Sequence, residues 1–251
     1  MPRETGGVPP SPTDLVHAFS ALQLLMVAAP GVEGFLYDVA KLAARIVDPP
    51  GSCGITLRRG DGPLTIASSD ERAELVDQAQ YSSGSGPCLD SLASGAFIDV
   101  PDLGSDGRWP EFRRRAQAEG VHSCLAAPLT DGQSILGALN LYGHRPRVFD
   151  DAAQQQARTF AAQASTALVL VLRTAAQAEQ SEQLERALTS RTEIDQAIGI
   201  LMGQQRCTAD EAFALLRQHS QNNNRKLREV AVELITRVTG EAPVSGSRFD
   251  H

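Results

Sequence analysis

Residues 122–142 read HSCLAAPLTDGQSILGALNLY and decide the fold of the first part of the chain. Two largely apolar runs, 122–128 and 134–142, lie on either side of the turn residues Asp131 and Gly132. An Asp-Gly pair between two such runs is a strong hairpin signal, because these residues accept the backbone conformation of a tight turn. The stretch therefore predicts two neighbouring antiparallel strands.

Outward from this hairpin, the sequence predicts a second hairpin and a set of helices. Residues 53–58 and 63–68 flank the turn residues Gly60, Asp61 and Gly62 in the same way. Apolar spacing and boundary residues predict helices at 14–28, around 35–46, at 71–80 and at 109–119, a lone strand at 96–100, a loop at 81–87, and a long helix capped by Asp150 or Asp151. Two hairpins, one strand and flanking helices predict an α+β domain built on an antiparallel sheet.

The rest of the chain, from about residue 174 to Gly240, carries a helical pattern. A long connecting helix is expected to lead into a first helix at 184–204. The string Thr208-Ala209-Asp210-Glu211 forms a capping box, in which the threonine and the glutamate each satisfy a free amide of the next helix. A third helix is expected to start near Asn224. Such an all-α three-helix module buries its own apolar faces but cannot enclose a large catalytic cavity.

Charge is distributed unevenly along the chain. The 251 residues carry a net charge of -7, which excludes a protein that binds nucleic acid over its whole surface. Residues 184–240 hold eight basic and seven acidic side chains, and residues 222–228, NNNRKLR, hold three amides and three cations without an acid. Cations neutralise phosphates, and asparagine can donate to and accept from base edges. A solvated helix start with an asparagine cap explains the same residues, so both interpretations stay open.

Four short strings in the first part of the chain resemble the GAF family of sensor domains: GSGPCL at 84–89, GAFIDV at 95–100, LAAPL at 125–129 and ILGALNL at 135–141. The resemblance covers residues 14–172. It implies control by a small molecule, a redox signal or a partner protein. A small-molecule ligand of unknown identity would lie between the sheet and the loop at 81–92. We expect its pocket to include Cys88, Phe97, His122 and Cys124.

Three further strings resemble the three helices of the ANTAR family, in order and at the spacing of that family: SRTEIDQAIGILM at 190–202, DEAFALLR at 210–217 and NRKLREVA at 224–231. The resemblance implies a regulator of transcription antitermination. Such a regulator binds paired stem-loops in nascent messenger RNA, each with a six-base loop, and acts on the transcription machinery indirectly. Many members of the family carry a lysine where this chain has Ile198, which removes one cation from the first helix.

The resemblance and the local charge together select candidate RNA contacts. The cations are expected to contact phosphates and the asparagine a base; these residues are Arg191, Arg206, Asn224, Arg225 and Lys226. Gly199 is expected at a close-packing position, because its lack of a side chain lets a helix or RNA approach.

The predicted domain boundaries follow from these patterns. They are a disordered lead-in at 1–13, a GAF-like sensor domain at 14–172, a helical connector at 173–183, an ANTAR-like RNA-binding domain at 184–240 and a tail at 241–251. A heptad pattern starts at Leu184, with Leu184, Arg191 and Ile198 at one core position and Ala187, Ile194 and Leu201 at the other. The pattern predicts a coiled coil in a homodimer; a single helix in a monomer is the alternative.

Several classes of function are not expected. No apolar run reaches the roughly 20 residues of a membrane helix, and the start of the chain lacks an apolar signal core, so we expect a cytoplasmic protein. The four cysteines form no C-x-x-C pair and predict no metal site. No catalytic constellation is recognisable, and we expect no enzyme. Two other classes remain: a regulator whose helical tail docks a partner protein, and a thiol sensor using Cys88 and Cys124.

Overall fold

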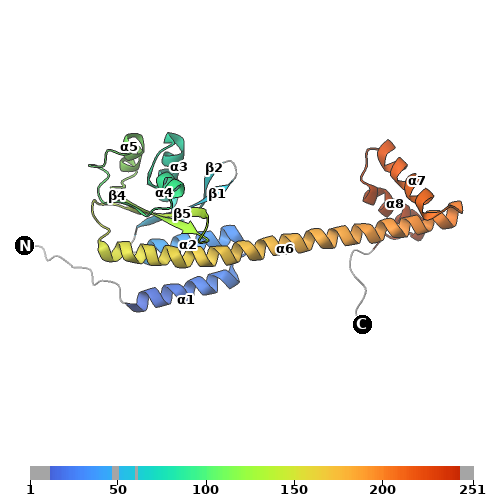
Figure 1. Cartoon of the computed structure of the whole chain (residues 1–251), viewed down its shortest axis with the longest axis horizontal. Coiled ribbons are helices and arrows are strands. Elements are labelled where there is room, and N and C mark those ends of the chain that lie inside the picture. The colour runs from blue at the N-terminus through green and yellow to red at the C-terminus, as the bar shows by residue number, and fades with distance from the viewer. Residues whose placement is uncertain (1–11, 47–50, 60–61, 244–251) are drawn as a thin grey trace, which may run out of the picture. The chain divides into compact units, whose positions relative to one another are not determined.

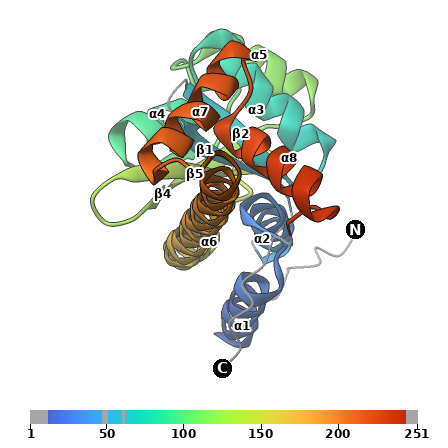
Figure 2. The ribbon, with the colours of Figure 1, turned by 90° about the vertical axis from the view of Figure 1, so that its right-hand side faces the viewer.

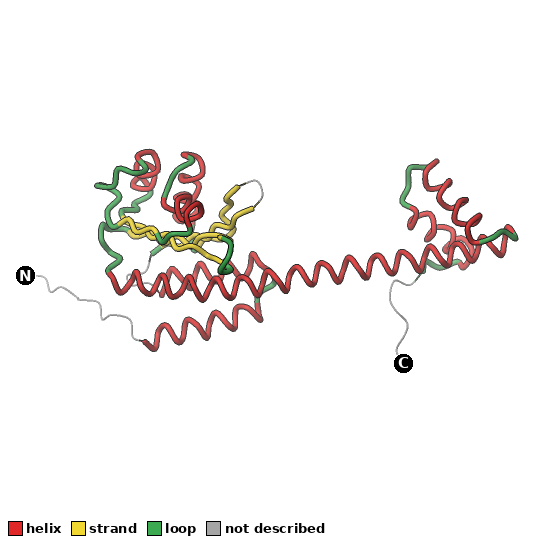
Figure 3. The backbone as a smooth tube through the Cα atoms, in the orientation of Figure 1, coloured by secondary structure: helices red, strands yellow, loops and turns green. Residues whose placement is uncertain are grey.

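The structure is a computed structural model that describes residues 12–46, 51–59 and 62–243. It divides into two compact units, Met1–Ala175 and Ala176–His251. Residues 1–11 of the predicted lead-in and 244–251 of the predicted tail lie outside the described residues, and residues 12–13 belong to the first helix. Figure 3 shows the helices and strands, which are α1 (Pro12–Ala28), α2 (Val32–Ile46), β1 (Ser52–Arg59), β2 (Gly62–Ser68), α3 (Glu71–Ser83), α4 (Pro87–Ser94), β3 (Ile98–Val100), α5 (Pro110–Ala118), β4 (Ser123–Thr130), β5 (Ile135–Gly143), α6 (Asp151–Gln205), α7 (Ala209–Asn222) and α8 (Leu227–Thr239).

The first unit is built on a five-stranded antiparallel sheet with strand order β2-β1-β5-β4-β3. The predicted hairpin at 122–142 forms its centre: β4 pairs with β5, and Ala126 lies opposite Asn140. The second predicted hairpin, β1 with β2, extends the sheet beyond β5, and the short strand β3 closes the other edge. The predicted α+β class, with an antiparallel sheet flanked by helices, is confirmed.

Helices cover both faces of this sheet, as Figures 1 and 2 show. Successive side chains of a strand point to opposite faces. Leu139 and Leu141 of β5 therefore join the apolar cluster under α2 and α6. Asn140 and Tyr142 of the same strand face α3 on the other side, in the layer formed by α3, α4 and α5. Helix α1 packs on α2, away from the sheet.

The beginning of α6 supplies a large part of the core on the α2 face. Phe160, Ala164 and Leu168 recur at helical spacing and are at most 2% exposed. By length and composition α6 could cross a membrane, with a mean hydropathy of 1.2 in its most apolar window, of which 33% is buried. The buried third of that window packs in the core, so part of the apolar character of α6 belongs to the core of the first unit.

The predicted loop at 81–87 is wrong in extent. Helix α3 continues to Ser83, and a further helix, α4, starts at Pro87. Gly84 ends α3 with a φ of 64°, in the left-handed region that glycine tolerates best. Pro87 suits the first turn of α4, because its fixed φ is helical and its missing N–H has no partner there in any case. The serines and glycines between them hid how short the non-helical segment is.

Helix α6 runs without interruption through the predicted connector at 173–183 and the predicted helix at 184–204. Its start follows the sequence prediction, since Asp150 Oδ1 accepts a hydrogen bond of 2.8 Å from the Ala153 amide. The second unit contains the end of α6 together with α7 and α8. Its core consists of Ala197, Leu216, Val230, Ala231 and Ile235.

The capping box before α7 is confirmed: Thr208 N–H donates to Glu211 Oε2 over 2.8 Å, and the Glu211 amide donates to Thr208 Oγ1 over 3.4 Å. The third helix starts three residues later than predicted, at Leu227. Asn224 has a φ of 49° and is left-handed, so it belongs to the turn and not to the helix.

We expect Leu168→Ala to lower the free energy of unfolding of the first unit by about 2–5 kcal/mol, because the cavity forms where α6 meets the sheet. Leu168 is 0% exposed, whereas Leu170 on the same helix is 46% exposed. The control Leu170→Ala should cost less than about 1 kcal/mol. Urea unfolding followed by tryptophan fluorescence measures both, and equal effects would contradict the placement of α6.

Candidate nucleic-acid interface and sensor core

The turn between α7 and α8 presents Asn224, Arg225 and Lys226, and all three side chains are exposed. Backbone bonds hold the turn: the Arg225 amide donates to the Ser220 carbonyl over 3.0 Å, and Ser220 Oγ donates back to the Arg225 carbonyl over 2.6 Å. The left-handed backbone of Asn224 is one that asparagine tolerates better than most residues. The three predicted contacts therefore lie side by side on a closed turn in contact with solvent.

The other two predicted cations lie on a different element. Arg191 is on α6, its side chain is 82% exposed, and its Nε lies 4.0 Å from Asp195 Oδ2. Arg206 follows the last residue of α6, is exposed, and has a φ of 53°. The predicted RNA contacts thus form two groups, one on the α7–α8 turn and one on α6 and its end.

Gly199 lies on the exposed side of α6, and among the residues that the structure describes none packs closely against it. A Cβ atom at Gly199 would meet no heavy atom within 4 Å, and the same holds at Gly203. The reason is that the apolar face of this part of α6, centred on Ala197, turns toward α8 and leaves both glycines outside. Ile198, the position that departs from the family, is half-buried.

An ion pair that the sequence did not reveal connects α6 to α8. Arg228 donates to Glu193 from Nε over 2.5 Å and from Nη2 over 3.2 Å, and Glu193 is only 3% exposed. This bidentate pair removes Arg228 from the free cations of the basic string and raises its pKa. A signal for the pair exists in the sequence, because Glu193 shares the face of Ala197, where a lone acid needs a buried partner.

In the first unit, a buried polar cluster fills the space between the sheet and α3. Asn140 Nδ2 donates to Asp77 Oδ1 over 2.9 Å, Tyr142 OH donates to the same oxygen, and Gln80 Nε2 donates to Tyr142 OH over 3.0 Å. All four residues are at most 1% exposed. Gln80 Oε1 also accepts a hydrogen bond of 2.8 Å from the Cys88 amide, which connects the start of α4 to the cluster.

The four predicted pocket residues are not brought together around one cavity. Cys88 packs with Leu92 and Ala138 beneath α4. Cys124 belongs to a separate cluster under α3 and α5. His122 is half-buried just before β4, where its backbone amide and carbonyl hold neighbouring segments. The prediction placed one pocket where the structure has packed side chains, because the pattern did not reveal α4.

Phe97 lies at a different place, in an open groove of about 760 Å³ between α6 and the last residues of β4. The guanidinium of Arg158 stacks over the Phe97 ring at 3.6 Å from its centroid. The floor of the groove is largely apolar and includes Pro128, Ala161 and Leu170. Of the four predicted pocket residues, only Phe97 borders this groove.

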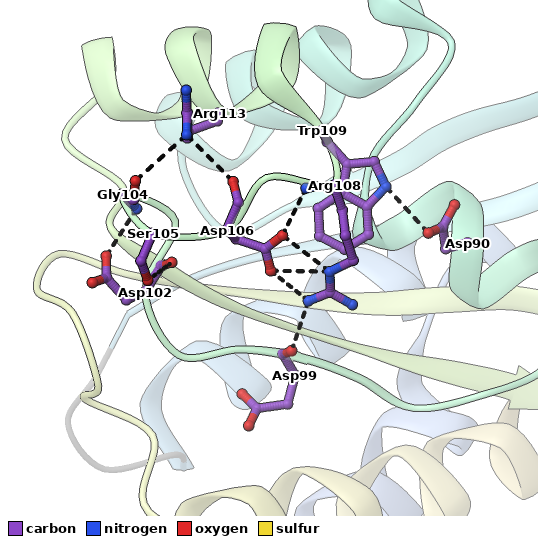
Figure 4. Close-up of polar contacts among 9 residues, drawn as sticks. All are labelled: Asp90, Asp99, Asp102, Gly104, Ser105, Asp106, Arg108, Trp109 and Arg113. Atoms are coloured by element: carbon purple, nitrogen blue, oxygen red, sulfur yellow. Dashed lines mark hydrogen bonds and ion pairs between the residues drawn. The ribbon is translucent and has the colours of Figure 1, made fainter.

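The aspartates between β3 and α5 serve the loop that carries them, as Figure 4 shows. Asp106 forms an ion pair of 2.6 Å with Arg108, whose hydrogen bonds lower the pKa of that carboxyl group. Asp102 Oδ1 accepts the Gly104 amide over 2.8 Å. Among the described residues, no three His, Cys, Asp or Glu side chains gather in a way that could hold a metal ion. These acids therefore stabilise a turn.

Comparison with known proteins supports both resemblances. Residues 32–169 match the GAF domain, and residues 182–235 match the ANTAR domain. The anaerobic nitric oxide reductase transcription regulator NorR of Citrobacter koseri is 39% identical over 113 residues, which is 42% of this chain and 21% of that protein. The chain thus spans about a fifth of the length of this curated relative.

Solved structures share the fold of the first unit. The reduced form of fRMsr of Staphylococcus aureus superposes with a TM-score of 0.51 at 13% identity, covering 65% of this chain and 99% of that one. The GAF domain of a phosphoenolpyruvate-protein phosphotransferase from Coxiella burnetii gives 0.50 at 15% identity, covering 65% and 98%. At such identities the likeness concerns the fold alone.

The three buried thiols, Cys53, Cys88 and Cys124, are expected not to react with iodoacetamide in the folded protein near neutral pH. Burial raises the pKa of all three, that of Cys88 to about 12 with a further contribution from Asp77, so each stays a protonated, unreactive thiol. Cys207 is half-exposed and should be labelled. Mass spectrometry should find one modified cysteine in the folded chain and four in denaturant. Rapid labelling of Cys88 or Cys124 would instead favour a thiol sensor.

Proposed function

We propose a function from the premise that this chain belongs to the GAF domain family and carries an ANTAR domain at residues 182–235. The protein regulates transcription antitermination by binding paired stem-loops in nascent messenger RNA, each with a six-base loop. The observation that carries this proposal is the exposed α7–α8 turn, on which Asn224, Arg225 and Lys226 are adjacent within the ANTAR domain. Binding to the antiterminator would favour it over the terminator.

The chemistry of the turn suits RNA. Lys226 forms no ion pair within the part of the chain that the structure describes, so its charge is available to a phosphate. Asn224 offers a donor and an acceptor to the edge of a splayed loop base. Arg191 on α6 and Arg206 directly after that helix would extend the phosphate contacts. The closed turn reduces the entropy lost on binding, since its backbone is already ordered.

We further propose that the protein acts as a homodimer, because two stem-loops need two ANTAR domains. Leu184 and Leu188 lie one helical turn apart on α6 and are 61% and 57% exposed, which leaves an apolar stripe for a second copy. Two positions of the predicted heptad, Ile194 and Leu201, instead pack within their own ANTAR domain. The seam between copies would therefore centre on Leu184 and Leu188. Linking two modest sites raises the avidity of the dimer through effective concentration.

The GAF domain would pass a signal to the ANTAR domain. The groove beside Phe97 is a better candidate for a ligand than the region of Cys88 and Cys124, because that region is filled by packed side chains. We place the protein in the cytoplasm, where nascent transcripts are made, and assign it no catalytic role. It would reach the transcription machinery only through the RNA.

We expect Arg225→Ala combined with Lys226→Ala to weaken binding of the full chain to an RNA carrying two six-base stem-loops. Affinity should fall roughly tenfold or more at moderate salt, and the slope of log affinity against log salt should flatten by about one to two. Gel-shift titration over a salt series measures both. The matched control, Lys41→Ala with Arg114→Ala, removes the same two charges from the GAF domain and should leave binding unchanged. Unaltered affinity of the first variant would overturn the proposal and favour a helical tail that docks a protein.

The dimer has its own test. Leu184→Glu with Leu188→Glu should convert the protein from a dimer to a monomer in sedimentation velocity, because two carboxylates would face each other across an apolar seam. Ala175→Glu with Ala178→Glu adds the same charge on the other side of α6 and should leave the dimer intact. A wild-type chain that sediments as a monomer at micromolar concentration would rule out the dimer.

A further inference from the structure

A ladder of charged residues at intervals of four starts at Arg225, just before α8, and continues along one face of that helix with Glu229, Glu233 and Arg237. Residues four apart on a helix are neighbours on its surface. Arg225 Nη1 lies 2.5 Å from Glu233 Oε2, and Arg225 Nε lies 3.9 Å from Glu229 Oε2. Arg237 Nη2 lies 2.7 Å from Glu233 Oε1, so Glu233 stands between two arginines.

The acids of the ladder form ion pairs with Arg225, one of the cations that are proposed to bind RNA. Arg225 and Lys226 are adjacent on the α7–α8 turn, but only Arg225 is held by acids of α8. Arg225 Nη1 donates a hydrogen bond to Glu233 Oε2, so donors of the guanidinium point at a carboxylate, and this bond raises the pKa of Arg225. An arginine binds a phosphate through the same planar fork of donors that it uses for a carboxylate. A phosphate and Glu233 therefore compete for one edge of Arg225.

We propose that Glu233 is an internal competitor of RNA at the ANTAR domain: its carboxylate holds Arg225 in the free protein, must be displaced for Arg225 to reach a phosphate, and so sets the affinity of each single site. This inference rests on the RNA-binding function proposed above. The side chains of Arg225 and Glu233 are 40% and 42% exposed, so the pair is weak enough for a phosphate to replace it. A weakened single site would disfavour arbitrary RNA and leave strong binding to paired loops on two domains.

The test uses the full-length chain and two synthetic probes, an RNA with two six-base stem-loops and an unstructured oligouridine. Glu233→Gln keeps the size of the side chain and removes its charge. We expect it to raise the affinity for both probes by about threefold to fivefold at moderate salt. The matched control is Asp210→Asn in the first turn of α7, which removes one charge from the same domain, where Asp210 has no ion pair among the described residues. It should change affinity less than about twofold.

A double-mutant cycle assigns the gain to Arg225. In the Arg225→Ala background, Glu233→Gln should no longer raise affinity, because the cation that it releases is absent. The same gain in both backgrounds would overturn the proposal, since it would reflect net charge or the release of Arg237. Equal affinity of Glu233→Gln and wild type, with wild type binding the stem-loops, would also overturn it while leaving the proposed function in place. If no variant binds either RNA, the proposed function itself fails, and this inference with it.

Discussion

The burial of one stripe of α6 is the interaction on which the first unit depends. Phe160, Ala164 and Leu168 close the face of the sheet that α2 covers only in part. Further along, the same helix contributes Ala197 to the core of the second unit. Between these two stretches, the side chains of residues 173–188 are all exposed. A helix without tertiary contacts is only marginally stable in water, so this middle stretch depends on its alanine, glutamine and glutamate content and on any partner that covers Leu184 and Leu188.

The two faces of the sheet differ in chemistry, and the difference bears on what a GAF domain can sense here. The α2 and α6 face is apolar and large. The α3 face carries Asp77, Gln80, Asn140 and Tyr142, which are joined by hydrogen bonds and shielded from solvent. Breaking any of these hydrogen bonds would leave a buried polar group unpaired, which is costly in a medium of low dielectric constant. A signal that acted through this face would have to rearrange the cluster, whereas a ligand in the groove beside Phe97 would not.

In the ANTAR domain, the number of basic residues says little about the charge that RNA can use. Arg228 is committed to the buried Glu193 and holds α8 on α6. Arg225 is shared with the ladder on α8. Lys226 and Arg206 remain without an ion pair among the described residues. The charge that a transcript meets therefore depends on which acid pairs with each cation. Those acids are Glu193, which is 35 residues from Arg228, and Glu229 and Glu233, which lie one and two helical turns beyond Arg225.

By itself, the sequence determined the class of fold, both families and the order of the elements apart from α4. Local rules govern these features: Asp131-Gly132 turns a hairpin, the Thr208–Glu211 box starts α7, and Asp150 caps α6. The tertiary structure alone decided the extent of α4, the exposure of Gly199 and the pairing of Arg228 with Glu193. It also decided that the four predicted pocket residues lie apart: Cys88, Phe97, His122 and Cys124. Each of these depends on which side chain from another segment occupies the neighbouring space. That information lies in the packing of segments far apart along the chain, and spacing within one segment does not contain it.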